Sequence, residues 1–149
     1  SDANSSEFSK NSKNPVIDIL PNQNLEKDDI GASMRLGTYP CKVKSNTHAQ
    51  EIYGNEIVYE RHRHRYEVNN KYRNDLEANG LVFSGVSPDD DLIEMIELKD
   101  HPFFVASQFH PEFKSRPWEP APMFNSFIKA SKEIDLSTEK IDDSTKVRD

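Results

Sequence analysis

Residues 108–113, with the sequence QFHPEF, are the stretch around which the rest of the chain is organised. The apolar run 103–106 leads into this stretch and predicts a buried strand that ends at a histidine and a carboxylate two residues apart. Pro111 fixes its own φ and favours an extended conformation for His110, and residues i and i+2 of an extended chain share a face. We therefore expect Glu112 to reach one ring nitrogen of His110.

A carboxylate bonded to one histidine nitrogen sets the tautomer of the ring and leaves the other nitrogen free as a general base. This arrangement is the orienting half of a catalytic triad, and the six residues contain no nucleophile. The alternative interpretation is a histidine at the end of a strand that makes an ordinary surface hydrogen bond. The six residues alone leave both interpretations open.

The composition favours a segment of a longer, acidic protein. The 149 residues could form one domain with a sizeable core, but 34% hydrophobic and 30% charged residues are lean for a single compact unit. We therefore expect frayed ends or a core completed by another segment, and the chain also starts without methionine. A net charge of −7 argues against general nucleic-acid binding and against an anionic membrane surface. The single cysteine and the lack of a spanning apolar run fit a cytoplasmic protein.

Hydrophobic periodicity and turn residues predict a chain of mixed strands and helices. The predicted strands cover 16–20, 34–43, 57–68, 81–87, 92–98 and 103–109, and the predicted helices cover 47–53, 70–79 and 121–133. Residues 1–14 and 22–33 have the composition of loops, and the charged tail 135–149 is expected to be disordered. The apolar face of the last helix is expected to comprise Met123, Phe124, Phe127 and Ile128.

The alternating arginines and histidines of residues 61–65 have two possible functions. His62 and His64 share one face of a predicted strand, but with no cysteine or third histidine nearby we predict no zinc site. Arg61, Arg63 and Arg65 occupy the opposite face, where they could bind one carboxylate or one phosphate. The alternative for the arginines is a solvated strand edge.

Cys41 and Glu7 carry little information alone. Cys41 follows a proline within a predicted strand and lacks the glycine-framed elbow that exposes a nucleophilic sulfur. We therefore predict that Cys41 is a buried or edge thiol with a structural role. Glu7, taken alone, is an ordinary loop carboxylate.

Four motifs together resemble the C-terminal glutaminase domain of the CTP synthase family, which is a class I glutamine amidotransferase. These motifs are MRLG at 34–37, ERHRHRYEVN at 60–69, HPFF at 101–104 and QFHPEF at 108–113, followed by Ser115 and Pro117. The match extends from about residue 3 to about residue 130. The histidine-proline-glutamate motif indicates only the wider amidotransferase class, and the arginine-histidine run narrows it to CTP synthases.

The resemblance implies an α/β fold, specifically the C-terminal part of a flavodoxin-like class I glutamine amidotransferase domain, with residues 1–134 belonging to that domain. It implies that His110 is the base of a triad and that Glu112 orients it. It also implies that Arg65 holds the α-carboxylate of substrate glutamine and that Glu7 receives its α-ammonium group. No metal and no cofactor are expected in this segment.

The resemblance further implies a parent enzyme that aminates UTP to CTP with ammonia from L-glutamine. The cysteine elbow, the oxyanion-hole glycines and the synthase domain that uses ATP and Mg²⁺ are expected N-terminal to Ser1, so we expect the isolated segment to be inactive. Activation by GTP, a homotetramer and a cytoplasmic location follow from the same resemblance. Two alternatives remain, namely another class I amidotransferase such as the glutaminase of GMP synthase, against which the run 60–69 argues, and a non-catalytic regulatory module.

Overall fold

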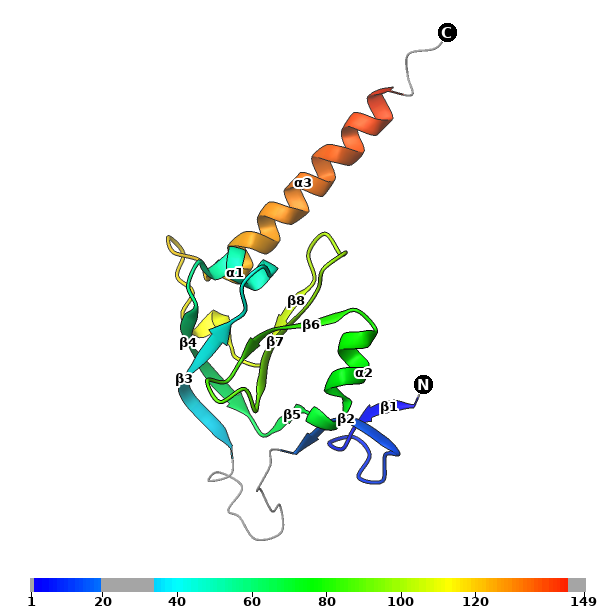
Figure 1. The fold of residues 1–149 in the computed structure, drawn as a ribbon. Helices are drawn as coiled ribbons and strands as arrows, with labels where there is room; N and C mark the ends of the chain where they lie inside the picture. Colours follow the sequence, from blue (N-terminus) through cyan, green and yellow to red (C-terminus); the bar gives the residue numbers. More distant parts are fainter. Residues whose placement is uncertain (1, 20–33, 145–149) are drawn as a thin grey trace.

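The computed structural model describes residues 2–19 and 34–144, and of these it describes 134–144 as backbone only (Figure 1). In chain order, the elements are β1 (Ala3–Ser5), β2 (Asn14–Ile19), β3 (Arg35–Val43), α1 (His48–Tyr53), β4 (Ile57–His64), β5 (Tyr66–Val68), the 3₁₀ helix η1 (Asn70–Tyr72), α2 (Arg73–Ala78), β6 (Leu81–Val86), β7 (Ile93–Leu98), β8 (Val105–Ser107), the 3₁₀ helix η2 (Pro111–Phe113) and α3 (Pro122–Ser144). The predicted loop 22–33 lies outside the described residues.

The strands form two sheets. The larger has the order β4-β3-β6-β7-β8, and every neighbouring pair in it is antiparallel. The smaller has the order β1-β2-β5, in which β2 and β5 are antiparallel and β1 and β2 are parallel. Because β4 and β5 are consecutive in the chain but belong to different sheets, the chain passes from one sheet to the other at Arg65.

Three strand predictions need correction. The single strand predicted at 57–68 is wrong, because the chain bends at Arg65 and is divided there into β4 and β5. The predicted loop 1–14 contains β1, whose three residues are held by backbone pairing with β2 and not by a hydrophobic pattern. The strand predicted as buried at 103–109 is reduced to β8, which is half-buried because it lies at the edge of its sheet.

Local signals account for the elements that the sequence predicted well. The side chain of Thr47 accepts a hydrogen bond from the backbone N–H of Gln50 and caps α1, and Gly54 ends this helix with a φ of 67°. The carboxylate of Glu97, on β7, accepts bonds from the N–H groups of His48 and Ala49 at 2.9 and 3.0 Å. A buried acid thus holds the start of α1 against the sheet.

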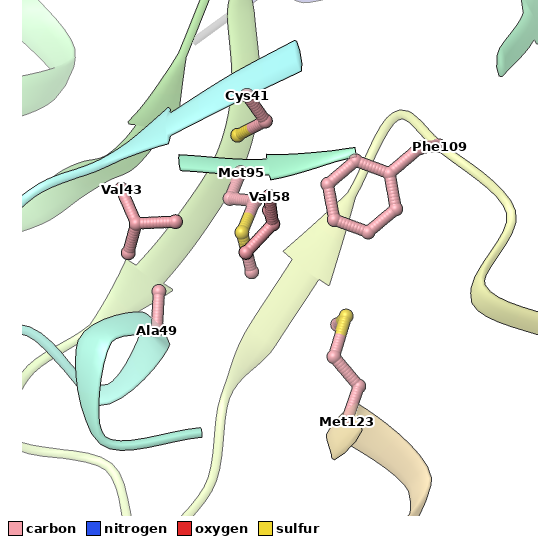
Figure 2. Packing of buried hydrophobic residues seen from close by; sticks show 7 residues of the cluster. All are labelled: Cys41, Val43, Ala49, Val58, Met95, Phe109 and Met123. Atoms are coloured by element: carbon pink, nitrogen blue, oxygen red, sulfur yellow. The ribbon is translucent and has the colours of Figure 1, made fainter. Parts of the chain in front are cut away.

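The hydrophobic core lies between the larger sheet, α1 and the start of α3 (Figure 2). Its buried side chains belong to Cys41, Val43, Ala49, Val58, Met95, Phe109 and Met123. Gly85 on β6 faces this core, and a Cβ atom at Gly85 would lie 2.8 Å from both Cys41 Sγ and Met95 Cγ. The close packing of β3, β6 and β7 therefore requires glycine at this position.

Helix α3 is longer and less covered than the sequence predicted. It continues to Ser144, past the position 135 at which a disordered tail was expected to begin, and in Figure 1 it projects from the body of the molecule. On its predicted apolar face only Met123 is buried, whereas Phe124, Phe127 and Ile128 are 41%, 52% and 64% exposed. Among the described helices, none combines the length and apolarity needed to cross a membrane.

Candidate active site

The segment that carries His110 connects two strands of the larger sheet. The backbone N–H of Gln108 donates to the carbonyl of Glu94 on β7, and that of His110 donates to the carbonyl of Arg61 on β4, both at 2.8 Å. Between them, the side chain of Phe109 is buried in the core. His110 therefore has a fixed backbone although it follows the last strand of the sheet.

Glu112 contacts His110 as the sequence predicted. Glu112 Oε1 lies 2.7 Å from His110 Nδ1. The predicted reason was incomplete, because only His110 is near an extended conformation (φ −108°, ψ 88°) and Pro111–Phe113 form a 3₁₀ turn. This turn, which starts at the proline as helices often do, brings the carboxylate back towards the ring.

The His110–Glu112 pair is partly open to solvent. The side chain of His110 is 38% exposed and that of Glu112 is 52% exposed. The hydrogen bond from His110 lowers the pKa of Glu112, so the carboxylate is ionised at neutral pH. An ionised acceptor at Nδ1 favours the tautomer with hydrogen on Nδ1 and leaves Nε2 as the basic nitrogen.

Glu7 and Arg65 line the same pocket, which has a volume of about 430 Å³. Glu7 lies in the turn after β1, and Arg65 is the single residue between β4 and β5. The other lining residues are Ile17, Met34, Arg63, His64, Tyr66 and Gln108. One carboxylate and two guanidinium groups at one pocket can bind the two charged ends of an amino acid.

The pocket and the His110–Glu112 pair are adjacent along the chain, but they are not lined by the same residues. Gln108 lines the pocket two residues before His110, whereas neither His110 nor Glu112 is part of its lining. Gln108 Nε2 lies 3.4 Å from both the carbonyl of Tyr66 and the carboxylate of Glu67. The structure thus brings Glu7 and Arg65 together, and it brings His110 and Glu112 together.

A buried polar network, which the sequence did not predict, lies behind this pocket. His62 Nδ1 lies 2.9 Å from His64 Nε2 and 3.3 Å from Glu94 Oε2, and Arg35 forms an ion pair with the other oxygen of Glu94. His64 Nδ1 in turn lies 3.2 Å from Glu67 Oε1. The signal that could have indicated this network is Glu94, a carboxylate among the apolar residues of the predicted strand 92–98.

Burial sets the protonation of this network. Burial, together with the nearby Arg35 cation, lowers the pKa of His62 to about 3 and that of His64 to about 4. Burial raises the pKa of Glu94 to about 7 and that of Glu67 to about 8. Both histidines are therefore neutral at neutral pH, and each carries hydrogen on one ring nitrogen only.

The same network bears on the metal prediction. Ligand atoms of His62, His64 and Glu94 lie within 4.8 Å of one another, so Glu94 supplies a third candidate ligand. Arg35 already neutralises Glu94, and the 2.9 Å between the two rings is the length of a hydrogen bond. Direct pairing accounts for this cluster without an ion, and the absence of a metal stays a prediction.

The arginines of the 61–65 run have different surroundings. Arg61 and Arg63 are exposed on the outer face of β4, opposite the inward His62. Arg61 lies over the ring of Phe113 at 5.8 Å, and Arg63 joins Arg65 at the pocket. The predicted anion site therefore involves the last two arginines.

Cys41 is buried, as predicted. Its side chain is fully buried in the core, and burial raises the pKa of the thiol to about 12. The reactive form of cysteine is the thiolate, which this environment disfavours. Cys41 is therefore a packing residue.

Comparison with known proteins gives the same family from sequence and from structure. Residues 10–130 match the family model described as "Glutamine amidotransferase class-I". The chain is 62% identical over 128 residues to a CTP synthase of Caldanaerobacter subterraneus subsp. tengcongensis, and 58% identical over 131 residues to that of Bacillus subtilis. These alignments cover 86% and 88% of this chain. Because these relatives are CTP synthases, the alternative that the chain resembles the glutaminase of GMP synthase is not favoured.

A solved structure of the glutaminase domain of Trypanosoma brucei CTPS, with bound acivicin, matches with a TM-score of 0.81 and 39% identity. This match covers 89% of our chain and 51% of the other, and the chain spans 24% of the length of the two CTP synthases. The α/β fold predicted from the sequence is confirmed by this match. The chain belongs to the class I glutamine amidotransferase family, and it is similar to the glutaminase domain of CTP synthases.

Proposed function

We propose that this chain is the part of a CTP synthase glutaminase domain that binds glutamine and supplies two members of the catalytic triad. In this proposal, residues 1–134 belong to the glutaminase domain. Arg65 binds the α-carboxylate of L-glutamine, and Glu7 binds its α-ammonium group. The observation that carries the proposal is that these two residues, which lie far apart in the sequence, line one pocket beside the segment that holds His110 and Glu112.

The proposed chemistry is acyl transfer. His110 takes the proton of a cysteine thiol from a segment outside this chain, and the resulting thiolate attacks the side-chain amide of glutamine. His110 then delivers this proton to the departing ammonia. His110 then takes a proton from the water that hydrolyses the γ-glutamyl thioester, and this step releases glutamate. Glu112 stabilises the charged ring of His110 during both steps, because it holds Nδ1 through a charge-assisted bond.

The ammonia then serves the amination of UTP to CTP, in a synthase domain that uses ATP and Mg²⁺. Activation by GTP, assembly into a homotetramer and a cytoplasmic location belong to the same proposal. They rest on similarity to CTP synthases over about a quarter of the length of those enzymes.

The test compares two nitrogen sources in the full-length enzyme. Arg65→Ala should raise the KM for glutamine roughly ten- to a hundredfold, the loss expected for a charge-assisted bond of about 1.5–3 kcal/mol. His110→Ala should remove most glutamine-driven turnover. Both variants should keep wild-type rates with an ammonium salt, and so should the control His101→Ala, which changes an exposed histidine. An ammonium-driven rate that falls together with the glutamine-driven rate would refute the proposal.

The chain on its own should release no glutamate from glutamine. Its only cysteine is buried, and loss of a triad nucleophile costs on the order of 10⁶ in turnover. Glutamate release by the purified chain that disappears in Cys41→Ala would contradict this expectation.

A further inference from the structure

Arg65 lies at a bend of the chain and lines the pocket. Arg65 is the single residue between β4, in the larger sheet, and β5, in the smaller sheet. Arg65 belongs to neither strand register, which end at His64 on one side and at Tyr66 on the other. Contacts that cross the bend between these two neighbours also constrain its backbone.

His64 bonds across the bend. Its Nδ1 lies 3.2 Å from the carbonyl oxygen of Tyr66, so the side chain before Arg65 contacts the backbone after it. The second nitrogen of His64, Nε2, lies 2.9 Å from Nδ1 of His62. The ring of His64 is therefore held at both nitrogens.

These contacts determine the tautomers. Two oxygens lie 3.2 Å from Nδ1 of His64, but Glu67 Oε1 makes no hydrogen bond, so the bond at this nitrogen is the one to the carbonyl of Tyr66. A carbonyl oxygen only accepts, so Nδ1 of His64 carries the hydrogen and Nε2 accepts from Nδ1 of His62. Nε2 of His62 then carries no hydrogen, which fits its burial without a hydrogen-bond partner. Burial keeps both rings neutral at neutral pH, so this order of donors and acceptors persists.

The other end of the pair contacts the segment of the base. The ring of His62 packs edge-on against Phe109, with 5.7 Å between ring centroids, and Phe109 immediately precedes His110. The backbone next to His62 also accepts the bond from His110 N–H, at the carbonyl of Arg61. The histidine pair thus lies between the segment of the base and the bend at Arg65.

We propose that His64 is a positioning residue for glutamine binding, which directs Arg65 into the pocket by bonding the carbonyl of Tyr66, with His62 holding the ring of His64 in place. This inference rests on the proposed function, because it assigns Arg65 to the α-carboxylate of glutamine. His64 also lines the pocket, but the proposed role acts through the backbone at Tyr66. No contact between His64 and glutamine is required.

The test uses two substitutions of His64 in the full-length enzyme. Asparagine places an N–H near the position of Nδ1, so His64→Asn can keep the bond to Tyr66. Glutamine places its amide near the position of Nε2, so His64→Gln keeps the contact with His62 and loses the bond to Tyr66. The control is His48→Gln, which changes a half-buried histidine on α1.

We expect His64→Gln to raise the KM for glutamine roughly five- to tenfold, as for loss of one hydrogen bond, with kcat within about threefold. His64→Asn should stay within about threefold of wild type in KM, and the ammonium-driven rate should be unchanged in all variants. An unchanged KM in His64→Gln would overturn the inference. So would equal losses in His64→Asn and His64→Gln, or a parallel fall in the ammonium-driven rate.

A measurement on the wild-type enzyme covers the case in which His64→Gln does not fold. Nitrogen-15 spectra of labelled histidines should identify His64 as the tautomer with hydrogen on Nδ1, and hydrogen on Nε2 would overturn the inference. Failure of the proposed function has a different signature, since wild-type enzyme would then form no CTP from glutamine. Wild-type activity with a normal KM in His64→Gln would overturn the positioning role alone.

Discussion

Replacement of Glu112 should show how much an orienting carboxylate contributes when it is half exposed. Two substitutions separate the effect of the negative charge of Glu112 from the effect of its hydrogen bond with His110. Glu112→Gln keeps an oxygen that can accept from Nδ1 of His110 and removes the negative charge, whereas Glu112→Ala removes both. Because neither side chain is buried, both variants should fold.

The expected magnitude follows from the contact. A distance of 2.7 Å between Oε1 and Nδ1 is typical of a charge-assisted bond, whose net worth is about 1.5–3 kcal/mol. Exposure of 52% for Glu112 and 38% for His110 lets water screen the pair, so the lower end applies. Glu112→Ala should therefore lower kcat with glutamine about tenfold, and Glu112→Gln about three- to fivefold. Loss of a buried orienting aspartate in a serine protease costs far more, about 10⁴.

The assay is steady-state CTP formation by the full-length enzyme with glutamine, repeated with an ammonium salt. The matched control is Glu119→Ala, an exposed carboxylate in the loop that follows η2. The KM for glutamine should change little, because Glu112 contacts His110 and does not line the pocket. The orienting role would be refuted if Glu112→Ala kept the wild-type kcat, or if its activity fell only because the KM for glutamine rose.

Three further predictions concern the buried residues. Cys41→Ala in the full-length enzyme should leave glutamine-driven CTP formation within a few-fold, because this thiol is fully buried in the core; an inactive but folded variant would contradict that role. Gly85→Ala should lower the free energy of unfolding by about 1–3 kcal/mol, measured by urea denaturation, since its Cβ would lie 2.8 Å from Cys41 Sγ. The double variant Gly85→Ala/Cys41→Ala should recover part of this loss. If the losses of the two single variants in free energy of unfolding simply add, the clash with Cys41 would be contradicted. Burial raises the pKa of Glu67 from 4.5 to about 8, so the folded state retains a proton that the unfolded chain releases, and stability should fall as pH rises through this range. Thermal unfolding between pH 5.5 and 9 should show a weaker decline in Glu67→Gln, and parallel curves would be evidence against the shift.

Residues with strong local preferences made part of the fold predictable. Thr47 and Gly54 define the two ends of α1, and the turn around Pro88 joins β6 to β7. The contact between His110 and Glu112 was also predicted, because two residues of spacing allow it in either an extended chain or a 3₁₀ turn. These features depend on neighbours in the sequence.

The features that were missed depend on distant pairing. His62 on β4 contacts Glu94 on β7, although β3 and β6 lie between these strands in the order of the sheet. The segment 108–110 bonds to both β7 and β4, so the sheet curves enough to bring them near the same segment. The buried positions shift from even-numbered residues in β4 to Glu67 in β5, but residues 57–68 contain no glycine or proline that marks the bend at Arg65.

The alternation of arginine and histidine in β4 follows from the two faces of this strand. With a period of two residues, Arg61 and Arg63 face outward while His62 and His64 face the interior. An apolar residue at position 64 would pack there, but it would remove the nearer of the two donors at Tyr66 O, leaving only Gln108 Nε2 at 3.4 Å; loss of one hydrogen bond costs about 0.5–1.5 kcal/mol. A lysine or arginine would bring a cation beside Arg35. A neutral histidine is long enough to span the bend and can donate at one end while it accepts at the other. His62 and His64, the inward-facing residues of the run 61–65, therefore help to position Arg65. This role accounts for the alternation of histidine and arginine in this strand.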